Sequence, residues 1–187
     1  MSHLDQLIAN YGLVALFIGC LLEGETVAMA GGVLAHRHLL VSSEVTAVVA
    51  LAAFTSDTLL FLLGRRYRTH PRMKRILAGK RAGRFLSAVN RHPRKIAMVF
   101  RFIPGLRIAA PLTLSQSGLP ALEYVALTGF TDIIWAVVLT TLGQGLSHLL
   151  LPLVGQGHHA EPWLIAGLIA ALVVGGLVLH RVLRRRL

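Results

Sequence analysis

Hydrophobic residues are concentrated in five stretches of the chain, separated by short polar or basic segments. The stretches cover residues 12–35, 45–63, 96–118, 124–154 and 163–179. Several approach the ~20 residues that an apolar α-helix needs to cross the ~30 Å of hydrocarbon in a bilayer. The pattern predicts an all-α integral membrane protein, with residues 1–187 forming a single membrane domain.

Two of the stretches contain residues that a straight membrane-spanning helix does not tolerate. Residues 12–35 carry Gly24 between two glutamates, and residues 96–118 carry Pro104 and Gly105. Proline and glycine interrupt helices, and a broken backbone at membrane depth is permitted only where protein or water covers it. We therefore predict two re-entrant helical hairpins that turn at these residues. A kinked span is the alternative for the first hairpin.

The remaining stretches predict about three transmembrane helices. The first ends at Gly64-Arg65, and the second lies within residues 123–150, with Tyr124 as an interfacial anchor. The third lies within residues 163–187 and ends in a basic tail.

Charge is sparse and unevenly placed. Mean hydropathy is +0.66, and charged residues make up 14% of the chain, against roughly 25% in soluble domains, so too little polar surface remains to cover a soluble core. Most of the 19 basic residues lie within residues 65–95, where apolar residues recur at helical spacing. This segment predicts amphipathic helices on the cytoplasmic membrane surface, with a solvated loop as the alternative. The multi-pass chain would also have a cytoplasmic C-terminus.

The two halves of the chain repeat one order of elements. Residues 12–64 predict a hairpin followed by a span, and residues 96–150 predict the same pair in the opposite orientation. Phe54-Thr55-Ser56-Asp57 is echoed by Phe130-Thr131-Asp132. Inverted repeats with broken helices are a recurrent design in transporters.

Several function classes are excluded. Membrane orientation and anionic lipid headgroups explain the basic residues without nucleic acid. Four histidines, His36, His38, His158 and His159, lack the helical ligand spacing or cysteine partner of a metal site. No nucleophile elbow, phosphate-binding loop or dinucleotide fingerprint is present. We therefore predict no enzyme activity, no cofactor and no metal.

Six ionisable residues lie inside the apolar stretches: Glu23, Glu25, Asp57, Arg101, Arg107 and Asp132. Exposed singly to lipid, they would cost roughly 15–20 kcal/mol together, so they must pair, reach water or shed charge. Because a guanidinium matches phosphate oxygens bidentately, Arg101 and Arg107 are predicted to hold a phosphate headgroup. The four carboxylates are predicted to carry protons or act as counter-ions, with Glu23 as the leading candidate.

Each role has a structural alternative. The two arginines could form ion pairs that only stabilise the fold. Asp57 lies roughly two helical turns before Arg65 and could pair with it. Asp132 could lie near the membrane interface.

Three motifs carry a resemblance to a known family. They are Phe100-Arg101-Phe102-Ile103-Pro104-Gly105-Leu106-Arg107, the span ending in Gly64-Arg65, and Leu22-Glu23-Gly24-Glu25-Thr26. The first resembles the second-hairpin arginine motif of the DedA family, also called the VTT or SNARE-associated Golgi protein domain. The second resembles the Gly-Arg-ended helix of that family, and the third resembles its short Glu-Gly-Glu-Thr branch. The chain departs from the commoner first hairpin, in which a Pro-Gly-acid follows the glutamate by about a dozen residues.

The resemblance implies a membrane lipid translocase of the flippase or scramblase kind in the bacterial inner membrane. Its implied substrate is polyprenyl (undecaprenyl) phosphate or a phospholipid, and its implied partners are anionic membrane lipids and protons. Two alternatives are a membrane-organising scaffold without transport and an intramembrane lipid-phosphate enzyme. A homo-oligomer is left open.

Overall fold

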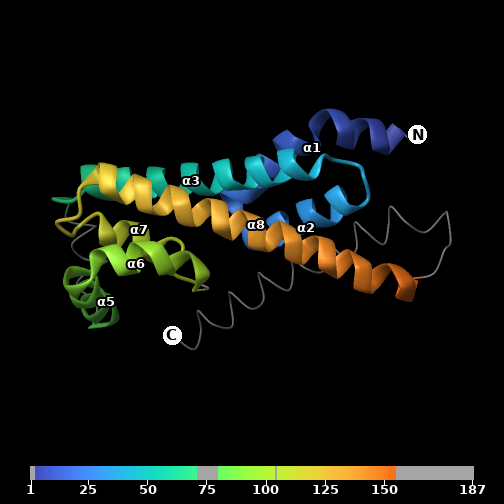
Figure 1. Cartoon of the computed structure of the whole chain (residues 1–187). Coiled ribbons are helices and arrows are strands. Elements are labelled where there is room, and N and C mark those ends of the chain that lie inside the picture. The colour runs from blue at the N-terminus through green and yellow to red at the C-terminus, as the bar shows by residue number, and fades with distance from the viewer. Residues whose placement is uncertain (1–2, 71–79, 104, 155–187) are drawn as a thin grey trace. The chain divides into compact units, whose positions relative to one another are not determined.

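The computed structural model describes residues 3–70, 80–103 and 105–154. Within these residues the chain is helical and contains no strand (Figure 1). The helices are α1 (His3–Leu22), α2 (Glu25–His36), α3 (Ser42–Arg66), α5 (Lys80–Arg91), α6 (Pro93–Val99), the 3-10 turn η1 (Phe100–Phe102), α7 (Ala109–Leu114) and α8 (Ala121–Val154). Three predicted features lie outside the described residues. They are Pro104, residues 71–79 of the basic segment, and the third predicted transmembrane helix, within residues 163–187.

The chain divides into two compact units. The terminal unit comprises residues 1–52 and 136–187, and the central unit comprises residues 53–135. The terminal unit includes α1, α2, the first part of α3 and the last part of α8. The central unit includes the rest of α3, then α5, α6, η1 and α7, and the first part of α8.

Two described helices are long and apolar enough to cross a membrane. They are α3, with 25 residues, and the Ala121–His148 part of α8, with 28 residues. At 1.5 Å per residue, 25 residues extend roughly 37 Å, which exceeds the ~30 Å of bilayer hydrocarbon. Both helices lie where the hydrophobic pattern predicts spans.

The first predicted hairpin is present as α1 and α2. The backbone between them breaks at Gly24, whose φ of 89° lies in the region that favours glycine. A Cβ atom on Gly19 would meet Val27 at 2.9 Å, and one on Gly31 would meet Leu16 at 2.8 Å. The contact nearer Gly24 joins residues 19 and 27, and the contact further from it joins residues 16 and 31. The two helices are therefore antiparallel. The helices are thus interrupted at Gly24, and the re-entrant placement stays a prediction.

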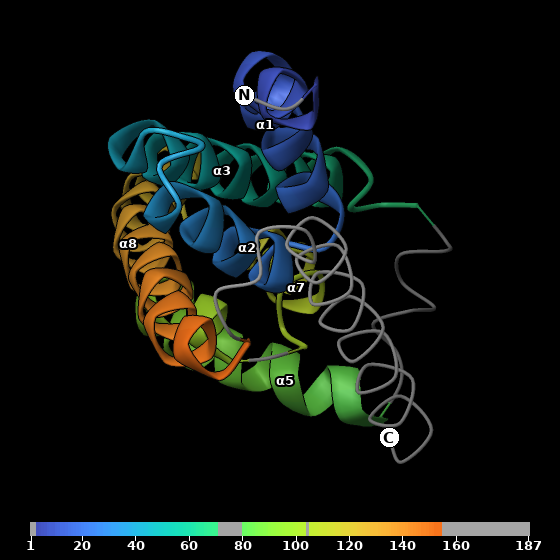
Figure 2. The same cartoon turned by 90° about the vertical axis from the view of Figure 1, so that its right-hand side faces the viewer.

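The terminal unit brings α2 and α8 into backbone contact (Figure 2). A Cβ atom on Gly32 would lie 2.2 Å from the carbonyl oxygen of Thr140, and one on Gly143 would lie 2.1 Å from that of Met29. The Thr140 hydroxyl also lies 3.1 Å from the Thr46 hydroxyl on α3. Small residues that let helix backbones approach are typical of membrane helix packing.

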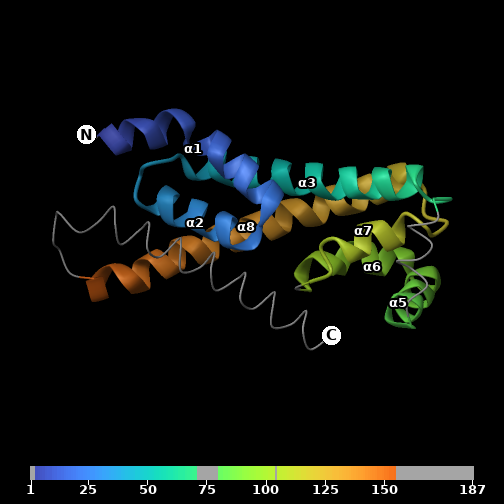
Figure 3. The same cartoon turned by 180° about the vertical axis from the view of Figure 1, so that it is seen from behind.

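The second predicted hairpin is present in the central unit as α6, η1 and α7. Its backbone turns at Gly105, with a φ of 87°. α5, α6 and α7 pack against one another (Figure 3). Together with η1, α3, the start of α8 and the loop before it, they enclose a core of fully or almost fully buried residues: Phe61, Val89, Ala97, Phe100, Ala110, Leu114, Leu119 and Tyr124. The short arms of this hairpin are thus covered by protein on one side, and its re-entrant placement stays a prediction.

The amphipathic character predicted for the basic segment is visible in α5. Val89 of this helix is fully buried in the core of the central unit and Phe85 packs against that core, while Asn90 and Arg91 are exposed. An amphipathic helix buries its apolar stripe and leaves its polar face outside. The described part of the segment therefore packs as a helix on the central unit rather than as a solvated loop.

Candidate functional site

The central unit contains an arginine held between two aspartates. Arg101 of η1 donates a hydrogen bond from Nη1 to Oδ2 of Asp57 on α3. Its Nε lies 3.2 Å from Oδ1 of Asp132 on α8. The guanidinium also lies 4.4 Å from the ring centre of Trp135, one turn further along α8. The site thus joins three elements that are far apart in the sequence.

These side chains are closed to solvent. Asp57 and Asp132 are 0% exposed and Arg101 is 5% exposed. Removing ionised groups from water is costly unless they are paired. The three residues therefore form one electrostatic unit, in which a single guanidinium faces two carboxylates.

Local structure explains how Arg101 reaches this position. α6 tightens into η1, and Ile103 then adopts an extended conformation before the turn at Gly105. Phe100, beside Arg101, is buried in the core of the central unit. The buried Phe100 ring fixes η1 at the end of α6, the first arm of the second hairpin. Arg101 is thereby directed toward α3 and α8.

A second group of contacts fixes α3 against α8 beside the site. The Tyr124 hydroxyl donates to the backbone carbonyl of Asp57 at 3.3 Å, and its ring stacks on Phe61 with the ring centres 3.9 Å apart. Tyr124 is fully buried, so its prediction as an interfacial anchor is wrong. An amphipathic ring with one polar atom suits either environment, and here a buried acceptor satisfies it.

Hydrogen bonding leaves part of the site unsatisfied. In the part of the chain that the structure describes, Oδ1 of Asp57 and both oxygens of Asp132 are buried without a hydrogen-bond partner. Buried polar atoms are normally satisfied, so each exception calls for an explanation. The unsatisfied oxygens make the two aspartates candidates for binding a proton.

The predicted partner of Arg101 in phosphate binding occupies a different environment. Arg107 is half-buried in the turn before α7, and it lies close enough to interact electrostatically with Asp57. The two arginines therefore belong to one region of the central unit. They differ in exposure, because only Arg101 is enclosed by α3 and α8.

The predicted helix end at Gly64-Arg65 has a packing role. A Cβ atom on Gly64 would lie 2.3 Å from the Ser115 hydroxyl oxygen. Arg65 donates to the carbonyl of Leu119 at 3.1 Å, and its guanidinium lies 5.6 Å from the ring centre of Phe61. Arg65 thus binds the loop before α8. Asp57 pairs with Arg101 and not with Arg65.

The two predicted glutamates lie in the terminal unit, on either side of the hairpin break. Glu23 is half-buried and follows α1, and its amide donates to the carbonyl of Gly19 at 2.9 Å. Glu25 is the first residue of α2 and is exposed. A carboxylate in the first turn of a helix interacts favourably with the helix dipole.

Trp135 is a site residue that the sequence analysis missed. It lies three residues after Asp132, and residues three apart on a helix share a face. A tryptophan face is the best aromatic partner for a guanidinium. An acid inside an apolar stretch followed by a tryptophan one helical turn later was the signal that could have placed Trp135 at the site.

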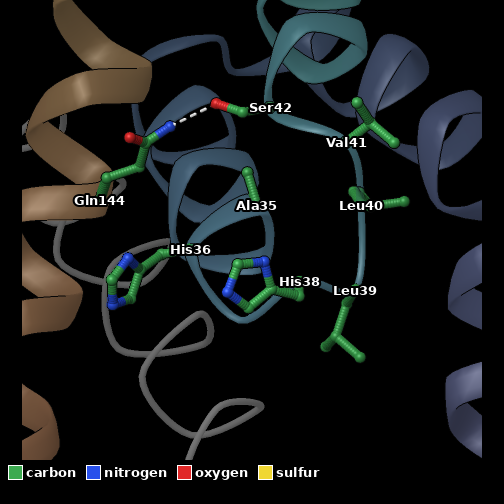
Figure 4. Close-up of a pocket in the computed structure, with 8 residues that line it drawn as sticks. All are labelled: Ala35, His36, His38, Leu39, Leu40, Val41, Ser42 and Gln144. Carbon is green, nitrogen blue, oxygen red and sulfur yellow. Dashed lines mark hydrogen bonds between the residues drawn. The ribbon is translucent and has the colours of Figure 1, made fainter.

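The terminal unit contains a cavity of about 480 Å³ at the C-terminal end of α2. Figure 4 shows its polar lining, with His36 and His38 on one side and a 2.7 Å hydrogen bond from Gln144 to Ser42 on the other. The His36 ring also lies 4.0 Å from that of His148, centre to centre. No group of three residues suited to hold a metal occurs among the described residues.

Comparison with known proteins identifies similar sequences. The VTT domain matches residues 22–145. The inner membrane protein YohD of Escherichia coli (strain K12) is 34% identical over 173 residues, which cover 92% of this chain and 90% of that protein. No solved structure matches.

Proposed function

This chain belongs to the VTT domain family, also called the DedA family, and on that premise we propose that it moves an anionic lipid across the bacterial inner membrane. The family is linked to membrane transport, and the similar YohD is an inner membrane protein by name. The lipid classes we propose are undecaprenyl phosphate and anionic phospholipids. The observation that carries the proposal is the enclosed Arg101 between Asp57 and Asp132.

The headgroup would bind by exchange at Arg101. A phosphate, like a carboxylate, accepts two parallel N–H bonds from one guanidinium. We expect phosphate to replace one aspartate on Arg101 while the other aspartate keeps the guanidinium in place. Arg107, half-buried nearby, would supply a second cation to the same headgroup.

Proton binding would balance the charge of this exchange. With both aspartates ionised, Asp57, Asp132 and Arg101 together carry one excess negative charge. A displaced aspartate would leave a further uncompensated charge in a buried site, which is strongly unfavourable. Uptake of a proton by the released carboxyl would remove that charge, so lipid movement would be coupled to protons.

Glu23 is the proposed proton carrier of the terminal unit. It lies at the break between α1 and α2, where the backbone is already interrupted at Gly24. A half-buried side chain at a helix break keeps contact with water, which a proton carrier needs. Glu25, which is exposed, is proposed as an auxiliary counter-ion.

A test of transport uses purified full-length protein in proteoliposomes. Labelled undecaprenyl phosphate and labelled phosphatidylglycerol are followed separately from one leaflet to the other, with and without a proton gradient. Protein-dependent movement of either lipid supports the proposal, and the faster lipid identifies the substrate class. Movement of both lipids at the rate of empty liposomes contradicts it.

The same ion pair favours a second candidate function, a membrane-organising protein that moves no lipid. In that case Arg101 would only fix η1 to α3 and α8 within the central unit. Arg107→Ala would then alter the capture of partner proteins and leave lipid distribution unchanged. A lipid-product assay in the same liposomes would identify the remaining alternative, an intramembrane enzyme acting on lipid phosphates.

A further inference from the structure

A second cavity, of about 440 Å³, lies in the central unit, and neither Arg101 nor Arg107 lines it. One wall is the turn between α5 and α6, residues 90–95, and the other is the loop before α8, residues 117–120. Glu123 in the first turn of α8 completes the lining. None of the residues assigned to the transport site lines this cavity.

The lining carries an excess of positive charge. Arg91, Arg94 and Lys95 are all exposed, and Glu123 is the single carboxylate among the lining residues. Arg94 binds that carboxylate with two donors, Nε and, at 3.3 Å, Nη2. The Arg94–Glu123 pair is therefore neutral overall, and Arg91 and Lys95 give the cavity its net positive charge.

The floor of the cavity is built from buried contacts. Ser117 and Leu119 are 2% and 3% exposed. The Ser117 hydroxyl donates to the carbonyl of Leu114 at 2.7 Å and accepts from the amide of Leu119 at 3.3 Å. The Leu119 carbonyl in turn accepts from Arg65. The loop is thus fixed in the free protein, so a ligand would not have to order it.

We propose that this cavity binds the phosphate headgroup of an anionic phospholipid at the membrane surface. Two observations and one general rule support the lipid as the occupant. The cavity adjoins α5, whose apolar residues Phe85 and Val89 face the core while its end at Arg91 is exposed. The chain is a membrane protein, so phospholipids are the phosphate compounds at highest local concentration. Basic pockets beside membrane helices are an established form of lipid headgroup recognition.

The ligand chemistry follows from the number of charges. A phosphodiester headgroup carries one negative charge, and two basic side chains can each donate to its oxygens. A zwitterionic headgroup adds a cation that Arg91 and Lys95 would repel. The site should therefore prefer phosphatidylglycerol to phosphatidylcholine, and it would hold lipid whether or not the protein also moves lipid.

The test measures the thermal unfolding of the full chain in a neutral detergent. Short-chain phosphatidylglycerol, short-chain phosphatidylcholine and inorganic phosphate are titrated in separate experiments. We expect phosphatidylglycerol to raise Tm in a saturable way, since a ligand that binds the folded state stabilises it. Phosphatidylcholine should have no saturable effect, and inorganic phosphate should need a much higher concentration.

Matched single-charge variants locate the effect. Arg91→Gln and Lys95→Gln should each raise the phosphatidylglycerol concentration at half-maximal shift by about fivefold. Arg66→Gln removes an exposed charge from the end of α3 and should leave that concentration unchanged.

Three outcomes would overturn the proposal. An equal effect of Arg66→Gln and Arg91→Gln would show only a general charge effect. An equal shift with phosphatidylcholine would show a response to acyl chains, and an equal shift with inorganic phosphate would show a site for free anions. A failure of the transport assay would leave the proposal standing, because the binding measurement requires no lipid movement.

Discussion

Arg101 donates a hydrogen bond to Asp57, a residue 44 positions earlier in the chain, and both side chains are enclosed by protein. The contact joins the second hairpin to the helix that precedes the basic segment. Asp132 approaches the same guanidinium from α8. The central unit is thus organised around one cation and two acids.

Removing the cation should be more damaging than removing one acid. Arg101→Gln leaves two buried carboxylates without a counter-charge, and breaking a buried pair in this way costs about 3–5 kcal/mol. Asp57→Asn leaves Arg101 with Asp132 and should cost less. Reversible unfolding in mixed detergent micelles measures both variants. Equal stability of Arg101→Gln and wild type would show that the enclosed arrangement does not exist in the membrane protein.

The contact between α2 and α8 makes a prediction with an internal control. Gly143→Ala places a methyl group where the Met29 carbonyl oxygen lies 2.1 Å away, and this neighbour is backbone that cannot rotate aside. We expect a loss of about 2 kcal/mol or more in unfolding free energy. Gly145→Ala on the same helix meets nothing within 4 Å. It should be neutral or stabilising by up to about 1 kcal/mol, because alanine favours helix.

Comparison of the two variants in one unfolding assay tests the packing directly. A loss for Gly143→Ala with none for Gly145→Ala is the expected result. The same loss for both would place the helix contact elsewhere.

The histidine contact at the end of α2 predicts a pH dependence of stability. Partial burial, followed by the charges of His148, His38 and Arg37, lowers the pKa of His36 below its ordinary 6.5. Below about pH 6.5 the unfolded chain therefore binds a proton at His36 that the folded chain does not, and stability falls as pH falls through that window. Above this window the histidine is neutral in both states and contributes no slope.

Unfolding measured between pH 5 and pH 8 checks this sign. His36→Gln should flatten the acid side of the profile, and His148→Gln should reduce its slope by removing one of the named causes. A slope that survives in His36→Gln would assign the pH dependence to other groups.

Local signals in the sequence were sufficient to predict the helix breaks. Gly24 and Gly105 both adopt positive φ values, and glycine inside an apolar stretch predicts such an interruption because it bears no Cβ. The two long apolar helices were predicted for a similar reason, since length and composition alone define them.

The partners of the buried charges could not be predicted in the same way. Bilayer energetics required Asp57, Asp132 and Arg101 to be compensated, but both Arg65 and Arg101 were available to Asp57. The choice depends on how η1 packs between α3 and α8, and this packing involves Tyr124 and the core residue Phe100. Such long-range packing has no signature in local spacing.

The most direct test of the account compares transbilayer movement of labelled undecaprenyl phosphate by four proteins in proteoliposomes. They are the wild type, Arg107→Ala, Glu23→Gln and the control Arg66→Gln. The account predicts movement by the wild type and the control that exceeds empty liposomes, with at least a tenfold loss, about 1.4 kcal/mol, in the other two variants. Equal movement by all four proteins, or none above empty liposomes with either this lipid or phosphatidylglycerol, would contradict it.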